Sequence, residues 1–241
     1  MPRVPRSDGG YRPYRGKPWR VIEGQHRPST MRIVDTDNEQ AVLEQVLETS
    51  KPPVPQECLH LDYQFWSPFR YGNYPRASRF RRAGLTPGVW YGSEAPLTAV
   101  AESIWGALRF FAASPDTPMP RWPVEHTAVQ AEISTPYCAD LAGSDWVNAG
   151  NWDDPDDYSE CLDLADRVRA AGAEAIRYAS VRHPGHAANL AVLTCAAFAR
   201  PAPIAFQTWH ILLKPTLVRA HCETLRQRYM FAVGETRLNW G

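Results

Sequence analysis

Apolar residues recur at helical spacing in three parts of the chain, and the first and third of these have recognisable ends. The first follows Asp37 or Asn38, either of which can cap a helix, and stops before the KPPVP segment; its apolar positions are Ala41, Val42, Val46 and Leu47. The third follows Asp156 or Asp157 and stops near Gly172, with inward-facing positions at Cys161, Leu162, Leu164, Ala165 and Val168. We expect two amphipathic helices here, the first of them a small entry segment.

The second helical pattern contains a charged exception. It begins at Pro96, a favoured first helical residue, and runs to about Phe111, with an apolar side formed by Leu97, Val100, Ile104, Leu108 and Phe111. Glu102 projects away from that side, together with Thr98, Trp105 and Arg109. The pattern therefore predicts a helix that presents one carboxylate on a face of its own.

Four short segments have the composition or the alternation of β-strands. They are GVWY (88–91), AVQAEIS (128–134), EAIRYASVR (174–182) and PIAFQTWHILLK (203–214). Two others indicate loops, one rich in aromatic residues and packed over a core (60–75), and one long enough to form a lid or a partner surface (136–159). Strands mixed with helices, without a regular βαβ rhythm, predict an α+β fold.

The N-terminal residues, 1 to about 30, show neither the helical spacing of apolar residues nor the alternation of a strand. They are rich in Pro, Gly and Arg, with two Tyr and one Trp, so we expect an extended arm. Its basic and aromatic mixture could dock on an acidic partner or on nucleic acid, but a solvated tail is the favoured interpretation. The chain is accordingly divided into an N-terminal arm with the entry helix (1–58) and a main domain (59–241).

Charge and cysteine content narrow the class of protein. The 26 basic and 26 acidic residues balance, which does not favour nucleic acid or an anionic membrane as the principal partner. The 5 cysteines are scattered without a Cys-x-x-Cys pair, so we expect neither a disulfide framework nor a zinc site. No apolar run approaches the roughly 20 residues that span a bilayer, and no apolar signal core follows the basic N-terminus. A reduced protein in the cytoplasm is expected.

Common catalytic motifs are missing from the sequence. There is no Gly-x-x-x-x-Gly-Lys, Gly-x-Gly-x-x-Gly, His-Glu-x-x-His or Gly-x-Ser-x-Gly, which argues against NTPase, Rossmann, zincin and hydrolase-elbow chemistry. His183 and His186 have a spacing that a metal could use, but a turn after a strand is favoured because no other ligand lies close by, and no metal is expected. Cys161 and Cys195 lie in apolar patterns and are expected in the core rather than as nucleophiles.

Four polar residues fall at the ends of predicted elements. Singly, Arg79 reads as a surface arginine, Tyr91 as a packed strand residue, Glu102 as a solvated helix residue and Ser180 as an ordinary strand serine. Together they form a long-range order: Arg79-Phe80, a glycine-bearing loop into Tyr91, Thr98-Ala99 leading to Glu102, then Tyr178-Ala179-Ser180-Val181-Arg182 with Gly185 and Asn189.

This order resembles the RES domain family, named for an Arg, a Glu and a Ser, over about residues 63–206. The resemblance implies an ADP-ribosyltransferase-like fold with mixed sheets and flanking helices. It also implies a bacterial, cytoplasmic toxin of an Xre–RES toxin–antitoxin pair that cleaves the nicotinamide–ribose bond of NAD⁺. The acceptor of the ADP-ribosyl group is water, phosphate or, in a mono-ADP-ribosyltransferase, a protein. A catalytically silent nucleotide-binding module is the alternative from another class.

The chemistry of NAD⁺ cleavage accounts for the residue types. A carboxylate stabilises the positive charge that develops on the ribose, which suits Glu102. A guanidinium pairs with phosphate oxygens, which suits Arg79, with Arg76, Arg81, Arg82 and Arg182 as alternatives. An aromatic face holds a pyridinium ring, which suits Tyr91. Ser180 would contact a phosphate, a ribose hydroxyl or the acceptor, and Asn189 completes the expected NAD⁺-binding set.

The resemblance also implies partners. We expect a cognate Xre-type antitoxin that covers or fills the pocket, NAD⁺ as substrate and inorganic phosphate as a candidate co-substrate. Neither a membrane nor direct nucleic-acid binding is expected, and the oligomer would contain either copies of this chain or the antitoxin. The segment before the motif, about sixty residues, exceeds what the family pattern requires.

Overall fold

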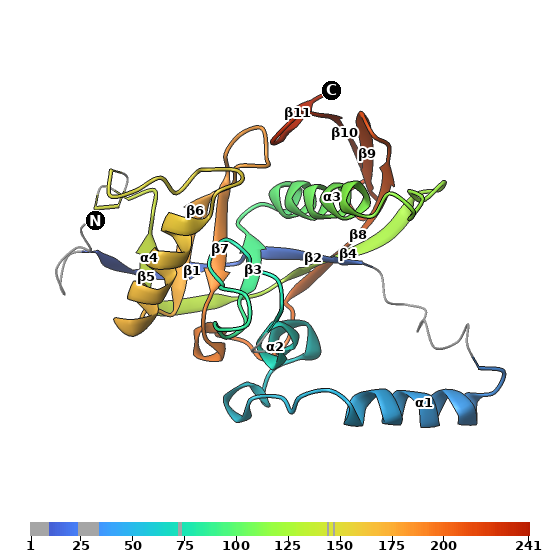
Figure 1. Cartoon of the computed structure of the whole chain (residues 1–241), viewed down its shortest axis with the longest axis horizontal. Helices are drawn as coiled ribbons and strands as arrows, with labels where there is room; N and C mark the ends of the chain where they lie inside the picture. Colours follow the sequence, from blue (N-terminus) through green and yellow to red (C-terminus); the bar gives the residue numbers. More distant parts are fainter. Residues whose placement is uncertain (1–9, 24–33, 72–73, 144, 147) are drawn as a thin grey trace.

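The computed structural model describes residues 10–23, 34–71, 74–143, 145–146 and 148–241 (Figure 1). Within them, one mixed sheet has the strand order β1-β5-β6-β7-β3-β2-β4-β8-β9-β10-β11. Its strands are β1 (Tyr11–Gly16), β2 (Trp19–Glu23), β3 (Trp90–Ser93), β4 (Val124–Gln130), β5 (Ile133–Asp140), β6 (Ala175–Ala179), β7 (Ala188–Val192), β8 (Ala205–Leu213), β9 (Leu217–Cys222), β10 (Gln227–Val233) and β11 (Leu238–Trp240). The described α-helices are α1 (Asp37–Thr49), α2 (Tyr63–Arg70), α3 (Pro96–Ala113) and α4 (Ser159–Ala170). The predicted α+β class is confirmed.

The sheet is weakly joined at its centre. Strands β2 and β3 are neighbours through a single residue pair, Trp19 with Ser93, whereas β2 pairs with β4 along five residues from Trp19 to Glu23. Two half-sheets therefore meet at a seam between β3 and β2. All strand pairs are antiparallel except β5 with β6.

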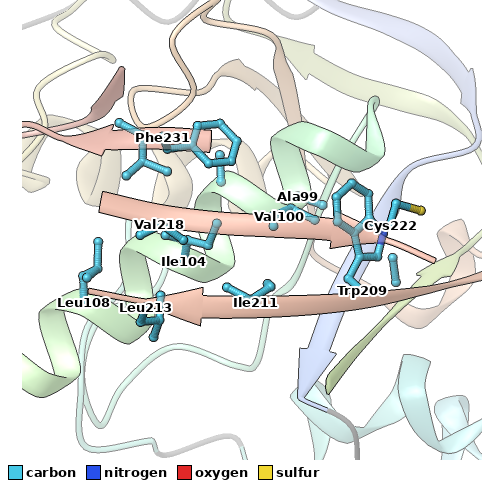
Figure 2. Close-up of a cluster of buried hydrophobic side chains, with 14 of the residues drawn as sticks. Ala99, Val100, Ile104, Leu108, Trp209, Ile211, Leu213, Val218, Cys222 and Phe231 are labelled. Atoms are coloured by element: carbon cyan, nitrogen blue, oxygen red, sulfur yellow. The ribbon is translucent and has the colours of Figure 1, made fainter. Parts of the chain in front are cut away.

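Helix α3 covers the half-sheet that contains β8, β9 and β10. Figure 2 shows its apolar side facing the inward residues of those strands, and the buried cluster includes Val100, Ile104, Ile211, Val218 and Phe231. Burying aliphatic and aromatic side chains of this size contributes about 1.5–3 kcal/mol each. The periodicity that predicted this helix thus corresponds to its buried side.

Two further clusters pack on the other half-sheet. Helix α4 buries Leu164 and Val168 against Ile176 of β6. Helix α2 brings Phe65 into a cluster whose members also include Trp90 and Phe198, with the Phe65 and Phe198 rings stacked 4.8 Å apart. Because alternate residues of a strand face opposite sides, Trp90 enters this core while Tyr91 is left for the other face.

The N-terminal segment is not an unattached arm. Residues 11–16 and 19–23 form strands of the sheet, and Trp19 is buried in it. The prediction failed here because both strands are short, β1 ends in a glycine, and only Lys17 and Pro18 separate it from β2, which hides their alternation. Residues 1–9 and 24–30 of the expected arm lie outside the described residues.

Two loop predictions also need correction. The aromatic segment 60–75 contains helix α2, whose N-cap is Asp62. Pro68 lies inside this helix, and the Gln64 carbonyl that Pro68 cannot bond accepts from Trp90 Nε1 instead. The long loop is shorter than expected, because residues 136–140 belong to β5 and the loop begins at residue 141. Helix α4 starts after Tyr158, which gives no side-chain cap, and Asp157 Oδ1 instead accepts from the N–H of Ser159, the first helical residue.

Helix α1 has the predicted position but not the predicted environment. Thr36 caps it in a capping box with Glu39, instead of Asp37 or Asn38. None of its residues is buried, and Val42 and Val46 are 61% and 58% exposed. Its apolar positions therefore remain uncovered within the described part of the chain.

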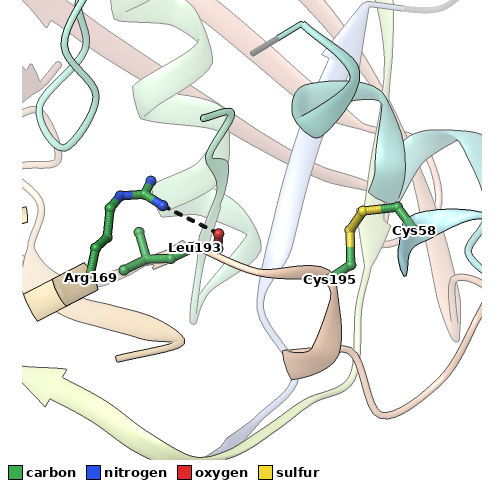
Figure 3. The surroundings of a disulfide bond; sticks show 4 residues. All are labelled: Cys58, Arg169, Leu193 and Cys195. Atoms are coloured by element: carbon green, nitrogen blue, oxygen red, sulfur yellow. Dashed lines mark hydrogen bonds between the residues drawn. A yellow bond between two sulfur atoms is a disulfide. The ribbon is translucent and has the colours of Figure 1, made fainter. Parts of the chain in front are cut away.

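The expectation of no disulfide is wrong for one pair. Cys58 and Cys195 form a disulfide across 137 residues of sequence (Figure 3), and both are buried beside the α2 core. Spacing could not reveal this pair because the fold alone brings the two 3₁₀ turns Gln56–Cys58 and Cys195–Ala197 together. Cys138, Cys161 and Cys222 are free and buried, as core cysteines are. None of the described helices has the length and apolar content to cross a membrane.

A pair of glycine variants tests the packing of α2 under the sheet. A Cβ at the buried Gly88 would overlap the carbonyl oxygen of Pro68, whereas a Cβ at the exposed Gly106 of α3 meets nothing. We expect Gly88→Ala to lower the free energy of unfolding by about 2–3 kcal/mol, and Gly106→Ala to raise it by about 0.5–1 kcal/mol. Urea titration measures both changes, and equal effects of the two variants would contradict the described contact.

Candidate active site

A pocket of about 430 Å³ lies at the seam between the two half-sheets. It is lined by residues 19–21 of β2, 91–93 of β3 and one face of α3, with Ala77, Ser78, Arg79 and Tyr158 from the loops. This volume is in the range of small-molecule sites. Because β2 and β3 pair only at Trp19 and Ser93, the strands leave room for a ligand beside the seam.

Glu102 enters the pocket from α3. Its neighbours Val100 and Ile104 face the sheet, so the helix turns the Glu102 side chain to a different face. Glu102 Oε1 accepts a 2.6 Å hydrogen bond from Ser180 Oγ and a 2.7 Å hydrogen bond from Asn189 Nδ2. No described residue donates to Oε2. One carboxylate oxygen is therefore fixed by the protein, and the other is available to a ligand.

Ser180 lies behind Glu102 and does not line the pocket. It is fully buried just after β6, and its Oγ also accepts from the backbone N–H groups of Arg182 (3.3 Å) and His183 (3.0 Å). The predicted contact of Ser180 with a phosphate, a ribose hydroxyl or an acceptor would require its bond to Glu102 to break. In this arrangement the hydroxyl orients the carboxylate.

Asn189 joins the same network from β7. Its Oδ1 accepts a 2.6 Å hydrogen bond from Ser93 Oγ at the seam, which leaves the Nδ2 group directed at Glu102. Both Asn189 and Ser93 are buried. The seam of the sheet and the carboxylate are thus linked by one chain of hydrogen bonds, Ser93 to Asn189 to Glu102.

Arg79 reaches the pocket with much of its hydrogen-bonding capacity already used. Its guanidinium donates to the backbone carbonyls of Trp152 (2.8 Å) and Asp154 (3.0 Å) and lies 4.5 Å from the centre of the Tyr158 ring. These acceptors belong to the loop 141–158. The predicted phosphate ligand is therefore also the residue that anchors this loop beside the pocket.

Of the other arginines considered as phosphate ligands, one lines the pocket and three do not. Arg182 lines the pocket, but it donates to the carbonyls of Thr236 and Pro155 and lies over the Trp105 ring at 4.8 Å. By contrast, the remaining three arginines are not in the described lining: Arg82 pairs with Asp163 and Asp166, Arg81 lies over Tyr74, and Arg76 precedes the lining residues of its loop.

Arg20 is the functional candidate that sequence reasoning missed. It lines the pocket from β2, donates one long hydrogen bond of 3.4 Å to the carbonyl of Tyr91, and has no carboxylate partner among the described residues. Burial lowers the pKa of Arg20 from 12.5 to about 10, partly offset by Tyr91. Because the group is a base with a lowered pKa, its charge opposes folding at all pH values below about 10. An anion in the pocket would remove that penalty.

Tyr91 forms part of the wall, and its hydroxyl is engaged. The hydroxyl accepts from the Phe80 N–H at 3.1 Å and shares a 2.9 Å hydrogen bond with Ser78 Oγ. Burial raises the pKa of Tyr91. The residue thus fixes the 78–80 loop, and its ring remains at the pocket surface.

The pocket is strongly cationic. Its described lining holds Arg20, Arg79, Arg109 and Arg182, with Glu102 as its single carboxylate, and aromatic rings from Trp19, Tyr91, Trp105, Tyr158 and Tyr178. Such a site suits a ligand with phosphate groups, a flat ring and a group that a carboxylate can approach. In the described residues no group of three or more His, Cys, Asp and Glu side chains could hold a metal ion.

Comparisons with known proteins place the chain in a family. A family model described as RES domain matches residues 53–213. A search of curated proteins gave no match. Among solved structures, one similar chain belongs to the MbcT–MbcA toxin–antitoxin complex of M. tuberculosis; it is 13% identical, the likeness covers 86% of this chain and 88% of that chain, and the TM-score is 0.47. The matched residues include Arg79, Tyr91, Glu102 and Ser180, whereas Arg20 precedes them.

The charge of Arg20, which has no carboxylate partner, should lower the stability of the empty protein and favour binding of an anion. Burial lowers the pKa of Arg20, which has no carboxylate partner among the described residues, so Arg20→Met should recover part of the free energy lost on desolvating this charge. We expect this variant to unfold at a temperature several degrees higher than the parent protein. Pyrophosphate should raise the melting temperature of the parent protein and not that of Arg20→Met.

The control for this comparison is Arg12→Met, which removes an exposed arginine of β1 that pairs with Asp145. Its response to pyrophosphate should equal that of the parent protein. An Arg20→Met variant that is less stable and still stabilised by pyrophosphate would contradict the described role of Arg20.

Proposed function

Because the chain belongs to the RES domain family, we propose that it is the toxin of a bacterial toxin–antitoxin pair and that it degrades NAD⁺ at the seam pocket. The observation that carries this proposal is the state of Glu102. Two donors, Ser180 and Asn189, hold Oε1, while no described residue donates to Oε2, and Glu102 lines the pocket. A carboxylate oriented in this way suits a reaction that develops positive charge on a sugar.

The arginines would bind the diphosphate of the substrate, and an aromatic ring would bind its nicotinamide. Arg20 has an unpaired charge and would contact the diphosphate first, with Arg79 and Arg182 adding positive potential. Tyr91 lies on the neighbouring strand and offers a ring surface to the nicotinamide while that ring is positively charged. The ribose between these two groups is then directed to Glu102.

The reaction breaks the bond between the ribose C1″ atom and the nicotinamide nitrogen. The electron pair of that bond moves to the nitrogen, so nicotinamide leaves as a neutral molecule and positive charge appears on the ribose. Glu102 Oε2 stabilises this charge and binds a ribose hydroxyl. An oxygen of phosphate or water then bonds to C1″, giving ADP-ribose 1″-phosphate or, after loss of a proton from water, ADP-ribose.

Ser180 and Asn189 act through Glu102. Holding one carboxylate oxygen in advance means that the carboxylate does not have to be reordered as charge develops, which is how preorganised groups lower a barrier. The loop 141–158 is tied to Arg79 and Arg182 at the pocket edge. An antitoxin that covers this edge would block the substrate, and an Xre-type antitoxin is the partner that the family implies.

The first prediction from this proposal concerns Glu102→Gln. The substitution keeps the shape of the side chain and removes its charge, so NAD⁺ consumption should fall by about 10²–10³-fold. Phosphorus NMR of the purified protein with NAD⁺, with and without inorganic phosphate, measures both the rate and the product. ADP-ribose 1″-phosphate that forms only with phosphate would identify a phosphorylase, and ADP-ribose in both samples a glycohydrolase.

The matched control is Glu132→Gln, a partly exposed carboxylate that pairs with Arg200 and lies outside the pocket lining. It should leave the rate unchanged. Full activity of Glu102→Gln would refute the assignment of the carboxylate. Unchanged NAD⁺ with the parent protein, together with ADP-ribose on a protein acceptor, would favour the mono-ADP-ribosyltransferase instead.

The second prediction distinguishes residues that orient Glu102 from a residue that binds the substrate. Ser180→Ala and Asn189→Ala each remove one donor to Glu102 Oε1, and we expect each to lower kcat by about 10–100-fold with little change in KM. Arg20→Met should mainly raise KM, because it removes a contact with the diphosphate. If Ser180→Ala changed KM alone, the serine would contact the substrate directly.

A further inference from the structure

Two apolar surfaces remain uncovered in the described part of the chain. One is the ridge of helix α1 formed by Val42, Leu43 and Val46. The other is a groove of about 470 Å³ on strands β8, β9 and β10, on the side facing away from α3. Exposed apolar surfaces with polar rims commonly mark places where proteins bind one another.

Helix α1 needs a partner to be stable. It has 13 residues and buries none of them, and helices of this length are marginal in water without packing. Within the described residues it is held by its capping box and by the ion pair of Glu48 with Arg70. Its charged side chains are all acidic: Asp37, Glu39, Glu44 and Glu48.

The groove has the opposite charge. Its apolar surface includes Leu212 and Met230, the latter 42% exposed. Arg219 and Arg228 line it from neighbouring strands, and neither forms an ion pair with a described carboxylate. An acidic amphipathic helix would cover the apolar floor and place its carboxylates near these two guanidinium groups.

We propose that helix α1 of one copy of this chain docks in the groove of a second copy, and that two such contacts close a symmetric dimer. Within one copy the contact is not made, because α1 lies at one end of the molecule and strands β9 and β10 at the other (Figure 1). Direct pairing of two α1 helices is disfavoured because all of their charges are acidic. With two-fold symmetry each copy gives one helix and receives one, so both apolar surfaces are buried.

The proposed interface combines two helix-in-groove contacts. A helix of 13 residues is about 20 Å long, and a stable interface buries about 1,200–2,000 Å² in total. Each of the two helix-in-groove contacts would therefore have to bury about half of that total area, with an apolar ridge on an apolar floor. The recognition mode is a known one, in which one face of an amphipathic helix supplies anchors at i and i+4, here Val42 and Val46.

Sedimentation velocity of the full chain over a range of concentrations tests the proposal. We expect a dimer whose dissociation constant rises at least tenfold in Val46→Asp, which places a charge on the ridge, and in Arg219→Glu/Arg228→Glu. Ala83→Glu, in the exposed turn before β3 and away from both surfaces, is the control and should leave the dimer intact. Circular dichroism checks that each variant is folded.

A charge exchange makes the test specific to this pair of surfaces. Asn38 and Gln45 flank the ridge of α1 and are exposed. Asn38→Lys/Gln45→Lys should weaken the dimer of the parent chain and restore it in the Arg219→Glu/Arg228→Glu chain. A monomer at all concentrations, or a dimer that none of these variants affects, would overturn the proposal. Loss of binding to another protein without any effect on self-association would also overturn it and assign the helix to that partner.

Discussion

The single pairing of Trp19 with Ser93 determines where this protein can bind a ligand. A continuous sheet would satisfy its backbone groups along the whole of β2 and β3, and would leave no space between them. Here two half-sheets, each packed on its own helix, meet at one residue pair, and the pocket lies at that junction. Each half-sheet is packed by its own buried cluster, so the pocket belongs to the folded structure itself.

The charged and polar groups of the site are also held at this junction. Ser93 stands at the seam and orients Asn189, which, with Ser180, fixes one oxygen of Glu102. On the other side of the seam, β2 places Arg20 in the pocket without an acidic partner. An oriented carboxylate and a guanidinium without a carboxylate partner in one pocket are costly in the empty protein, and the proposed dinucleotide would offset that cost. This balance between stability and function is typical of binding sites.

Sequence periodicity predicted the parts of the fold in which one face is buried and one is exposed. Helices α3 and α4 followed from the spacing of residues such as Val100, Ile104 and Leu164, and the order of Arg79, Tyr91, Glu102 and Ser180 predicted the family. Strand β2 could not be predicted, because five residues after a Gly-Lys-Pro sequence are too few to establish a period. The hydrogen bond of Ser180 with Glu102 and the disulfide of Cys58 with Cys195 join residues far apart in sequence. Only the packed sheet brings them together.

The central claim is that NAD⁺ lies across the seam, with its diphosphate on Arg20 and its nicotinamide-bearing ribose on Glu102. A crystal structure of the Glu102→Gln variant soaked with NAD⁺ tests it most directly. The account predicts phosphate oxygens within hydrogen-bond distance of the Arg20 guanidinium, and the ribose beside the side-chain atom that replaces Oε2. NAD⁺ bound away from the seam, or bound there with its adenine at residue 102, would contradict it.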